Sequence, residues 1–291
     1  MTQGEHVIRI LPPGTPGLAR SIEHRIGERW LRAFAVAVGD LREELFDLER
    51  ENGIVGHPLF PVCVEWPLIA HGAPGIELST ETLNVGLHVS HRLRMAEPLR
   101  PGRRVRTEAR LHRAEARRGA VHIVTEFRTF STTGEGLVTT HLGTLYRGTR
   151  LEGVPIPGTV EEVPTPETGA LDRVGSFDTD ATNAVIYSEC ANIWNPIHTD
   201  IRVARDAGLP DTVLHGTETL ARAVSTVTGS AVFPRHARVT GVDGRFTSPV
   251  FPGQTLTVNA GLAAEDAIAF DVRTVDGTPA ISAGLVRFAN R

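Results

Sequence analysis

The sequence predicts an α+β fold made of two similar units, each with an antiparallel sheet wrapped round one central helix, which pack together as a pseudo-dimer. The main observation is a repeat: residues 98–105 read PLRPGRRV, and residues 249–256, 151 positions further on, read PVFPGQTL. Both segments have the form Pro-apolar-x-Pro-Gly-x-x-apolar, and an alternating pattern follows each. Short glycine turns separate the later strands of each half, which is typical of antiparallel hairpins.

In the first unit, residues 28–51 have helical character, and the stretch LREELFDLERENG begins after Gly39-Asp40. We expect this segment to be the helix of the unit. After the Pro-Gly turn, residues 105–111 alternate apolar and polar side chains, the period of a half-buried strand. Further strands are predicted at 122–130 and 136–148, separated by the turn sequence Thr133-Gly134-Glu135-Gly136.

The second unit repeats this order with a clearer helix. Residues 214–229 place Leu220, Val224 and Val227 at helical intervals and end at Gly229. Strands follow at 256–262, 267–275 and 279–290, the last two separated by Asp276-Gly277. The segment RLEGVPIPGTVEEVPTPET between the units is rich in Pro and Thr. We therefore expect a first domain at 1–150, a linker at 151–169 and a second domain at 170–291.

Composition favours an ordinary globular protein. The 291 residues are 41% apolar and 22% charged, and the formal charge of -4 favours neither nucleic acid nor an anionic membrane as a partner. An arginine-rich stretch in the first unit is either a solvated strand face or an anionic patch for a coenzyme A or carrier-protein phosphate. With two cysteines, Cys63 and Cys190, and no apolar run of about 18 residues, we expect a reduced, cytoplasmic protein.

The most informative segment is YSECANIWNPIHTD at 187–200, followed by Leu214-His215-Gly216-Thr217. It resembles the hydratase motif of the MaoC-like family, Gly-Asp-x-Asn-Pro-x-His-x-Asp, which a His-Gly pair at the start of the central helix follows. The matching positions are Asn195, Pro196, His198, Asp200, Ala204, Gly208, His215 and Gly216. The chain is thus similar to (R)-specific enoyl-CoA hydratases/dehydratases of the double-hotdog type, with its active site in the second unit.

This resemblance implies a mechanism for adding water to an enoyl thioester, or removing it. His198 would be the general base or acid, and Asn195 would orient the water or the histidine. The thioester oxygen would lie against the backbone N–H of Gly216, at the positive end of the 214–229 helix. Asn192, Trp194 and Thr217 would complete the substrate site. The implied partner is an acyl thioester of CoA or acyl-carrier protein, bound by a monomer, a homodimer or a higher homo-oligomer.

The chain departs from the family at one catalytic position. The aspartate that stands five residues before the histidine is Ile193 here. Glu189, about one helical turn earlier, is one candidate for a substitute acid. Alternatively, Asn192 holds the water, or His198 acts alone. The first unit keeps Gly39-Asp40 where its own copy of the motif would fall, but its Asn and His positions read Arg42 and Leu45.

Other polar residues have structural interpretations. We expect His215 to hold the loop before Gly216 and Asp200 to begin a helix. His88 and His91 are three residues apart in a strand-like stretch, which predicts opposite faces and no metal site. The sequence also has no phosphate-binding loop or dinucleotide fingerprint, so no cofactor is expected.

Three functions stay open at this point. The first is a lyase that hydrates or dehydrates an acyl thioester through His198. The second is a divergent hotdog enzyme that has lost hydration and catalyses another proton transfer, such as isomerisation or cyclisation. The third is a non-catalytic thioester-binding subunit that supports a hydratase partner.

Overall fold

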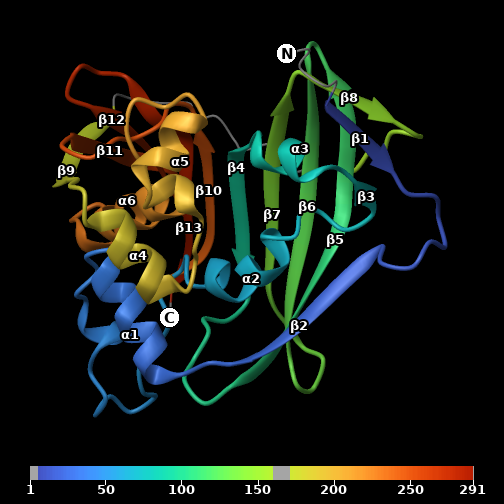
Figure 1. Ribbon diagram of the computed structural model, residues 1–291. Helices are drawn as coiled ribbons and strands as arrows, with labels where there is room; N and C mark the ends of the chain where they lie inside the picture. The colour runs from blue at the N-terminus through green and yellow to red at the C-terminus, as the bar shows by residue number, and fades with distance from the viewer. Residues whose placement is uncertain (1–5, 160–170, 291) are drawn as a thin grey trace.

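The computed structural model describes residues 6–159 and 171–290, and its main feature is one ten-stranded antiparallel sheet (Figure 1). The strand order is β2-β5-β6-β7-β4-β10-β13-β12-β11-β9. The first five strands belong to the first half of the chain: β2 Ala19–Arg25, β4 Gly86–Met95, β5 Arg104–Arg117, β6 Ala120–Ser131 and β7 Gly136–Arg147. The other five belong to the second half: β9 Asp172–Asp178, β10 Ala237–Phe246, β11 Thr255–Ala264, β12 Ala267–Thr274 and β13 Pro279–Asn290.

A smaller sheet and short helices complete the described structure. The small sheet has the order β3-β1-β8, formed by β1 His6–Ile10, β3 Ile76–Glu77 and β8 Thr149–Glu152. The α-helices are α1 Glu28–Ala37, α2 Pro61–Ile69, α3 Thr80–Asn84, α4 Asn183–Ala191, α5 Ile201–Asp206 and α6 Gly216–Gly229. Two 3₁₀ turns are η1 Glu43–Leu45 and η2 Pro196–His198. In residues 6–159 and 171–290, no helix is both long enough and apolar enough to span a bilayer.

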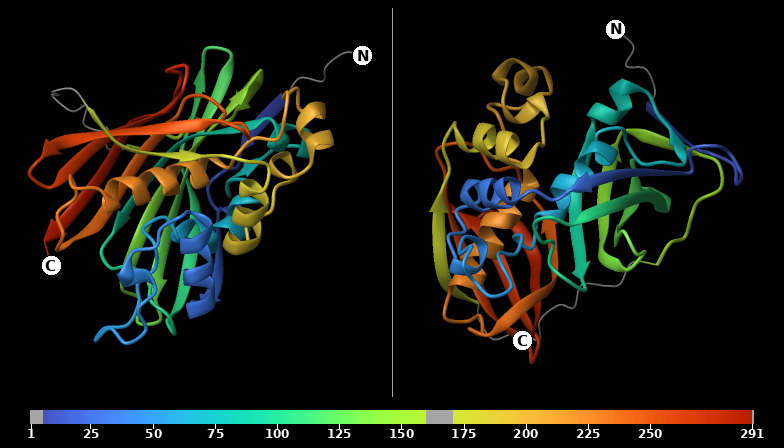
Figure 2. Two further views of the ribbon diagram at one scale, coloured as in Figure 1. Left: turned by 90° about the vertical axis from the view of Figure 1, so that its left-hand side faces the viewer. Right: turned by 90° about the horizontal axis from the view of Figure 1, so that it is seen from below.

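The two halves are joined edge to edge where β4 pairs with β10 (Figures 1 and 2). Arg92 lies opposite Asp243 in this pairing, and these residues are 151 positions apart, the offset of the sequence repeat. A local two-fold relation therefore passes between them. Helix α2 packs on β2 and β5, and α6 packs on the corresponding strands β9 and β11. The expected double hotdog is confirmed.

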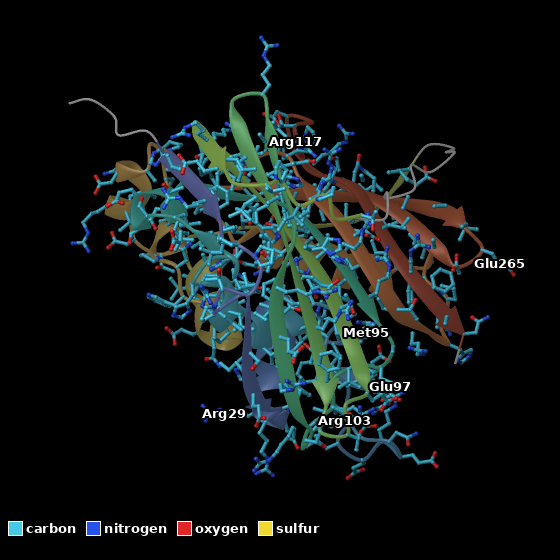
Figure 3. The ribbon with its side chains drawn as sticks, turned by 90° about the vertical axis from the view of Figure 1, so that its right-hand side faces the viewer. Arg29, Met95, Glu97, Arg103, Arg117 and Glu265 are labelled. Carbon is cyan, nitrogen blue, oxygen red and sulfur yellow. The ribbon has the colours of Figure 1, made fainter. Side chains whose placement is uncertain are left out.

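Figure 3 views the sheet from the side of the first half. Arg117 marks the end of the β5–β6 hairpin and Glu265 marks the β11–β12 hairpin of the other half. The Pro-Gly turns before β5 and β11 are at the positions that the repeat predicts. At the turn before β5, Arg103 and Glu97 form an ion pair of 2.9 Å. The predicted strands of both halves are confirmed to within a few residues at most ends.

The helix predicted at 28–51 is wrong in extent and in role. Helix α1 ends at Ala37, and Gly39 follows with a φ of 70°. Helix α1 packs against α4, while the true counterpart of α6 is α2. Helix α2 was not predicted from the sequence because this helix begins with Pro61 and contains Pro67. Proline is well tolerated at the first position of a helix, but in the interior it removes a backbone hydrogen bond.

The main hydrophobic core is continuous through both halves. It includes Leu93 of β4, Val242 of β10 and Val224 of α6, all fully buried. Phe34 of α1 and Tyr187 of α4 pack against each other with ring centroids 5.7 Å apart and an interplanar angle of 59°, so the two hotdog units share one interior. Within the predicted linker, Glu152 ends β8 and Ile156 bridges to Ala114 of β5, whereas 160–169 lie outside the described residues.

Candidate active site at the start of helix α6

His198 is held in one tautomer beside the start of α6. Its Nδ1 lies 2.6 Å from the carbonyl oxygen of Val213, and because a carbonyl only accepts, Nδ1 carries the proton. The unprotonated Nε2 is therefore the atom that can take a proton. The ring is stacked on His215 with centroids 3.7 Å apart. Burial, and to a lesser degree the neighbouring His215, lower the pKa of His198 to about 3, so the ring is neutral near pH 7.

Buried polar side chains of α4 and α6 surround His215. Ser188 Oγ lies 3.4 Å from His215 Nε2, and Glu218 Oε2 lies 3.8 Å from His215 Nδ1. Glu218 also accepts a hydrogen bond of 3.1 Å from Arg222 Nε. Burial lowers the pKa of His215 to about 3 and raises that of Glu218 to about 7. Ser188 is only 1% exposed, so its hydroxyl is not placed to attack a substrate. The hydrogen-bonded groups around His215 therefore position its ring.

Gly216 is the first residue of α6, and no side chain caps this helix end. The first N–H groups of α6 are therefore open to an oxyanion, together with the positive end of the helix dipole. A Cβ at Gly216 would lie 3.2 Å from the ring of Phe246 on β10. A side chain at this position would require the Phe246 ring to shift by a few tenths of an ångström, and Phe246 forms one wall of the approach to Gly216.

Residue 193 is the site of the departure from the family motif. Ile193 is 2% exposed, and Asn192 before it ends α4 in the left-handed region with a φ of 57°. Asparagine tolerates this conformation better than most residues, so Asn192 has a backbone role. The Ile193 N–H donates to Ser188 five residues back, as Asp40 does to Ala35 in the first half. Ile193 and Asp40 therefore occupy equivalent places.

In the first half, the residue equivalent to Ile193 is Asp40, and its carboxylate is already paired with other side chains. Asp40 is 2% exposed and forms an ion pair of 2.7 Å with Arg42. His57 Nε2 lies 3.5 Å from the same carboxylate and 3.1 Å from Ser225 Oγ. Although burial favours the protonated carboxyl, Arg42 and His57 together hold the pKa of Asp40 below its usual value. Asp40 is therefore paired within the first half, and His57 links it to Ser225 of α6.

The other predicted site residues lie in different surroundings. Asn195 caps the η2 turn by accepting from the Ile197 N–H, and Thr217 accepts a buried hydrogen bond of 3.0 Å from Tyr187. Trp194 is 53% exposed and Glu189 is also exposed, on α4. In the described part of the chain, no hydrogen bond or ion pair joins Glu189 to His198 or His215. Asp200 begins α5 by accepting from the Arg202 N–H, as expected.

The expectation that His88 and His91 point to opposite faces is wrong. The β4–β7 register shifts between His88 and Ser90, so a bulge turns both rings to one face, 5.6 Å apart. His88 lies 4.7 Å from Phe246, on the approach to Gly216. Burial lowers the pKa of His88 to about 4 and that of His91 to about 3. In the described part of the chain, neither ring nitrogen of His91 has a hydrogen-bond partner.

Sequence reasoning missed four residues of this site: Phe246, His88, Ser188 and Glu218. Phe246 and His88 come from strands β10 and β4 at the junction of the halves, far from the motif in sequence. Glu218 could have been predicted as a neighbour of His215, because residues three positions apart lie on the same face of a helix. The bulge that turns His88 has no such signal in a single sequence.

Comparisons with known proteins find two family models and several relatives for this chain. Residues 165–281 match the family model described as MaoC like domain, and residues 18–140 match the FAS1-like dehydratase domain region. Enoyl-CoA hydratase ChsH3 of Mycobacterium tuberculosis is 30% identical over 188 residues, or 64% of this chain and 63% of that protein. Peroxisomal multifunctional enzyme type 2 of Drosophila melanogaster is 33% identical over 144 residues, 48% of this chain and 24% of that protein.

Solved structures show the same fold. A MaoC-like dehydratase from Phytophthora capsici has a TM-score of 0.76 at 18% identity and covers 94% of this chain and 97% of its own. The Drosophila enzyme has a TM-score of 0.74 at 24% identity, with 93% of this chain and 48% of that chain covered. A Mycobacterium tuberculosis protein described as a double hotdog has a TM-score of 0.63 at 14% identity, covering 95% of this chain and 96% of its own.

The fold and these neighbours define a double hotdog protein. The chain carries a MaoC-like domain at residues 165–281 and a FAS1-like dehydratase region at residues 18–140.

Proposed function

We propose that this protein is a hydro-lyase that adds water to a 2-enoyl thioester of CoA or acyl-carrier protein, or removes it from the 3-hydroxy compound, with His198 as general acid/base. The observation that carries the proposal is the tautomer of His198. Its Nδ1–H is bound to Val213, which leaves Nε2 free to exchange a proton beside the uncapped end of α6. The relatives named as enoyl-CoA hydratases support the same reaction class.

The mechanism needs two parts that the site supplies. Nε2 of His198 removes a proton from water while the oxygen adds to C3 of the enoyl group. The negative charge moves to the thioester oxygen, where the backbone N–H of Gly216 and the α6 dipole stabilise it. His198 then returns its proton to C2. A protonated His198 with a pKa of about 3 is a strong acid, which favours this second transfer.

One observation favours a second candidate function. Ile193 is buried at the equivalent of Asp40, and no carboxyl at that position can share the water. The rival hypothesis is an enzyme that binds an acyl thioester and moves a proton without hydrating the substrate, by isomerisation or cyclisation. In a variant of this hypothesis, the protein is a subunit that binds the thioester and catalyses no reaction.

Turnover of crotonyl-CoA by the purified protein separates these hypotheses. The hydro-lyase predicts conversion to the (R)-3-hydroxy product and loss of that conversion in His198→Ala. Binding of a non-reactive acyl-CoA without any turnover would instead support the thioester-binding subunit. Isomerised product without added water would support the second candidate and contradict the first.

A further inference from the structure

A second cluster of reactive side chains lies far along the sheet from His198, on strands β5, β6 and β7. It consists of His112, Glu126 and His141, and one donor atom from each lies within 4.8 Å of the other two. Glu126 Oε2 is 3.2 Å from His141 Nε2 and 3.6 Å from His112 Nδ1. Strands β5, β6 and β7 run side by side across the middle of Figure 3.

The strand geometry brings the three side chains together. Glu126 lies directly opposite His141 in the β6–β7 pairing. The β5–β6 register shifts between Leu111 and Arg113, so His112 is the extra residue of a bulge. A bulge re-aims one side chain out of the regular alternation. Because Thr140 bonds to Glu65 of α2, the next residue His141 points away from the helix, and the cluster occupies that opposite face.

The hydrogen bonds leave the three facing atoms suited to a metal ion. His112 Nε2 is 2.7 Å from the Thr159 carbonyl oxygen and must donate to it, which leaves a lone pair on Nδ1. Arg110 and Arg128 each donate to Glu126 Oε1 at 2.7 Å, which leaves Oε2 facing the histidines. Second-neighbour contacts of this kind orient the ligands in metal sites. In a tetrahedral zinc site, adjacent ligand atoms lie about 3.3 Å apart.

The second half of the chain shows that the fold does not need polar residues here. The same bulge recurs between Leu262 and Ala264, and its extra residue, Ala263, lies 151 positions after His112. The registers make Ala269 the counterpart of Glu126, and Leu285 the counterpart of His141. These three residues form a small apolar cluster with Ala267 and Leu171. A buried ionic cluster is often no more stable than apolar packing, so its presence in one half suggests a ligand.

The surrounding charges permit a cation but weaken its binding. Arg110 and Arg128 are 52% and 47% exposed, so water and salt screen their repulsion. Arg92, which pairs with His141 across the strands, is neutralised by Asp243 at 2.6 Å. We propose that His112 Nδ1, Glu126 Oε2 and His141 Nε2 bind a divalent transition-metal ion of the Zn²⁺ class, with a solvent oxygen as fourth ligand. The ion would clamp three adjacent strands.

The test uses the tag-free protein of residues 1–291. Bound metal is first removed with a chelator, and the protein is then titrated with Zn²⁺ while calorimetry measures the binding. One Zn²⁺ per chain should bind, and Co²⁺ at the same site should give the visible absorption of a four-coordinate ion. His112→Ala and His141→Ala should each weaken zinc binding by about a hundredfold or more, since even second-neighbour changes cost about ten- to a hundredfold. The exposed His236 is the matched control, and His236→Ala should bind zinc like the natural protein.

A second variant guards against misfolding. His112→Ala/Glu126→Ala/His141→Leu reproduces the three residues of the other half, so it should fold and lose the zinc site. Zinc should raise the melting temperature of the natural protein but not that of this triple variant. The proposal is overturned if no one-to-one zinc binding occurs, or if binding survives unchanged in the triple variant and both single variants. Crotonyl-CoA turnover is a separate readout, so this result is independent of the proposed function.

Discussion

Residue 193 is where this sequence departs from the MaoC-like motif. Ile193→Asp would restore the carboxyl that the MaoC-like motif has five residues before the histidine. Crotonyl-CoA hydration should then rise by about tenfold to a hundredfold, toward the usual contribution of a positioned acid or base. The new carboxyl would be buried, which raises its pKa, so the gain should grow as the pH is raised.

The comparison for Ile193→Asp is the natural protein measured beside a relative with the complete motif. Our interpretation of the departure requires the natural protein to be the slower of the two. Equal rates would mean that Ile193 is no handicap, and an Asp variant that folds but gains nothing would point to the same conclusion.

The low pKa of His198 makes a second prediction at this scale. Catalysis by the neutral ring requires the pH to stay above the pKa, which is about 3 in this protein. The value of kcat/KM should therefore change little between about pH 8 and about pH 5.5. A histidine with the ordinary pKa of about 6.5 would lose most of its base form over that range. A decline of kcat/KM centred near pH 6.5 in protein that stays folded would contradict the geometry given for His198.

Helix α6 carries Glu218, a buried carboxyl whose pKa is raised by burial. Glu218 has a pKa of about 7 in the folded protein, against 4.5 for the free side chain. Below about pH 4.5 the carboxyl is neutral in both states. As the pH rises to about 7, the unfolded chain ionises first, so the free energy of unfolding falls.

Glu218→Gln removes this ionisation while keeping the shape of the side chain. The variant should raise the melting temperature relative to the natural protein at about pH 8, and by less at about pH 5. Glu265→Gln, at the exposed tip of the β11–β12 hairpin, is the control and should change the melting temperature little at either pH. The same shift of Glu218→Gln at both pH values would show that Glu218 does not titrate between them.

The elements also show which parts of the structure a single sequence can predict. The strands after each Pro-Gly turn were predictable because alternation and glycine turns are local signals. Helix α2 was not, because Pro61 and Pro67 resemble breaks and only packing on β2 and β5 stabilises the helix. The motif located His198 and Gly216, but Phe246 and His88 reach the site through the β4–β10 pairing, which no local pattern specifies.

In the whole molecule, one buried charge cluster lies at the centre of the sheet. Asp243 is fully buried and accepts from Arg92 at 2.6 Å and from Arg94 at 2.9 Å. These residues flank the local two-fold relation, so the two halves meet there with opposite charges at equivalent positions. Pairing of a half with a copy of itself would bring like charges together at this point. The opposite charges therefore favour pairing of the two different halves.

Asp243→Ala should therefore destabilise the whole molecule. Removing one partner of a buried ion pair leaves uncompensated charge and costs about 3–5 kcal/mol of the free energy of unfolding. The control is Glu97→Ala at the turn before β5, whose side chain is 46% exposed and whose partner Arg103 is 36% exposed. That surface pair should contribute less than about 1 kcal/mol. Urea denaturation of both variants checks the difference, and equal losses would contradict the role given to the central pair.

The central claim is that His198 moves the proton while His215 supports the structure beneath it. The direct test measures crotonyl-CoA turnover and the melting curve of His198→Ala and His215→Ala side by side. We predict that His198→Ala loses about a hundredfold to ten-thousandfold in rate with a nearly unchanged melting temperature. His215→Ala should lower the melting temperature first. Full activity in His198→Ala would contradict the account, as would an unfolded His198→Ala beside a folded, inactive His215→Ala.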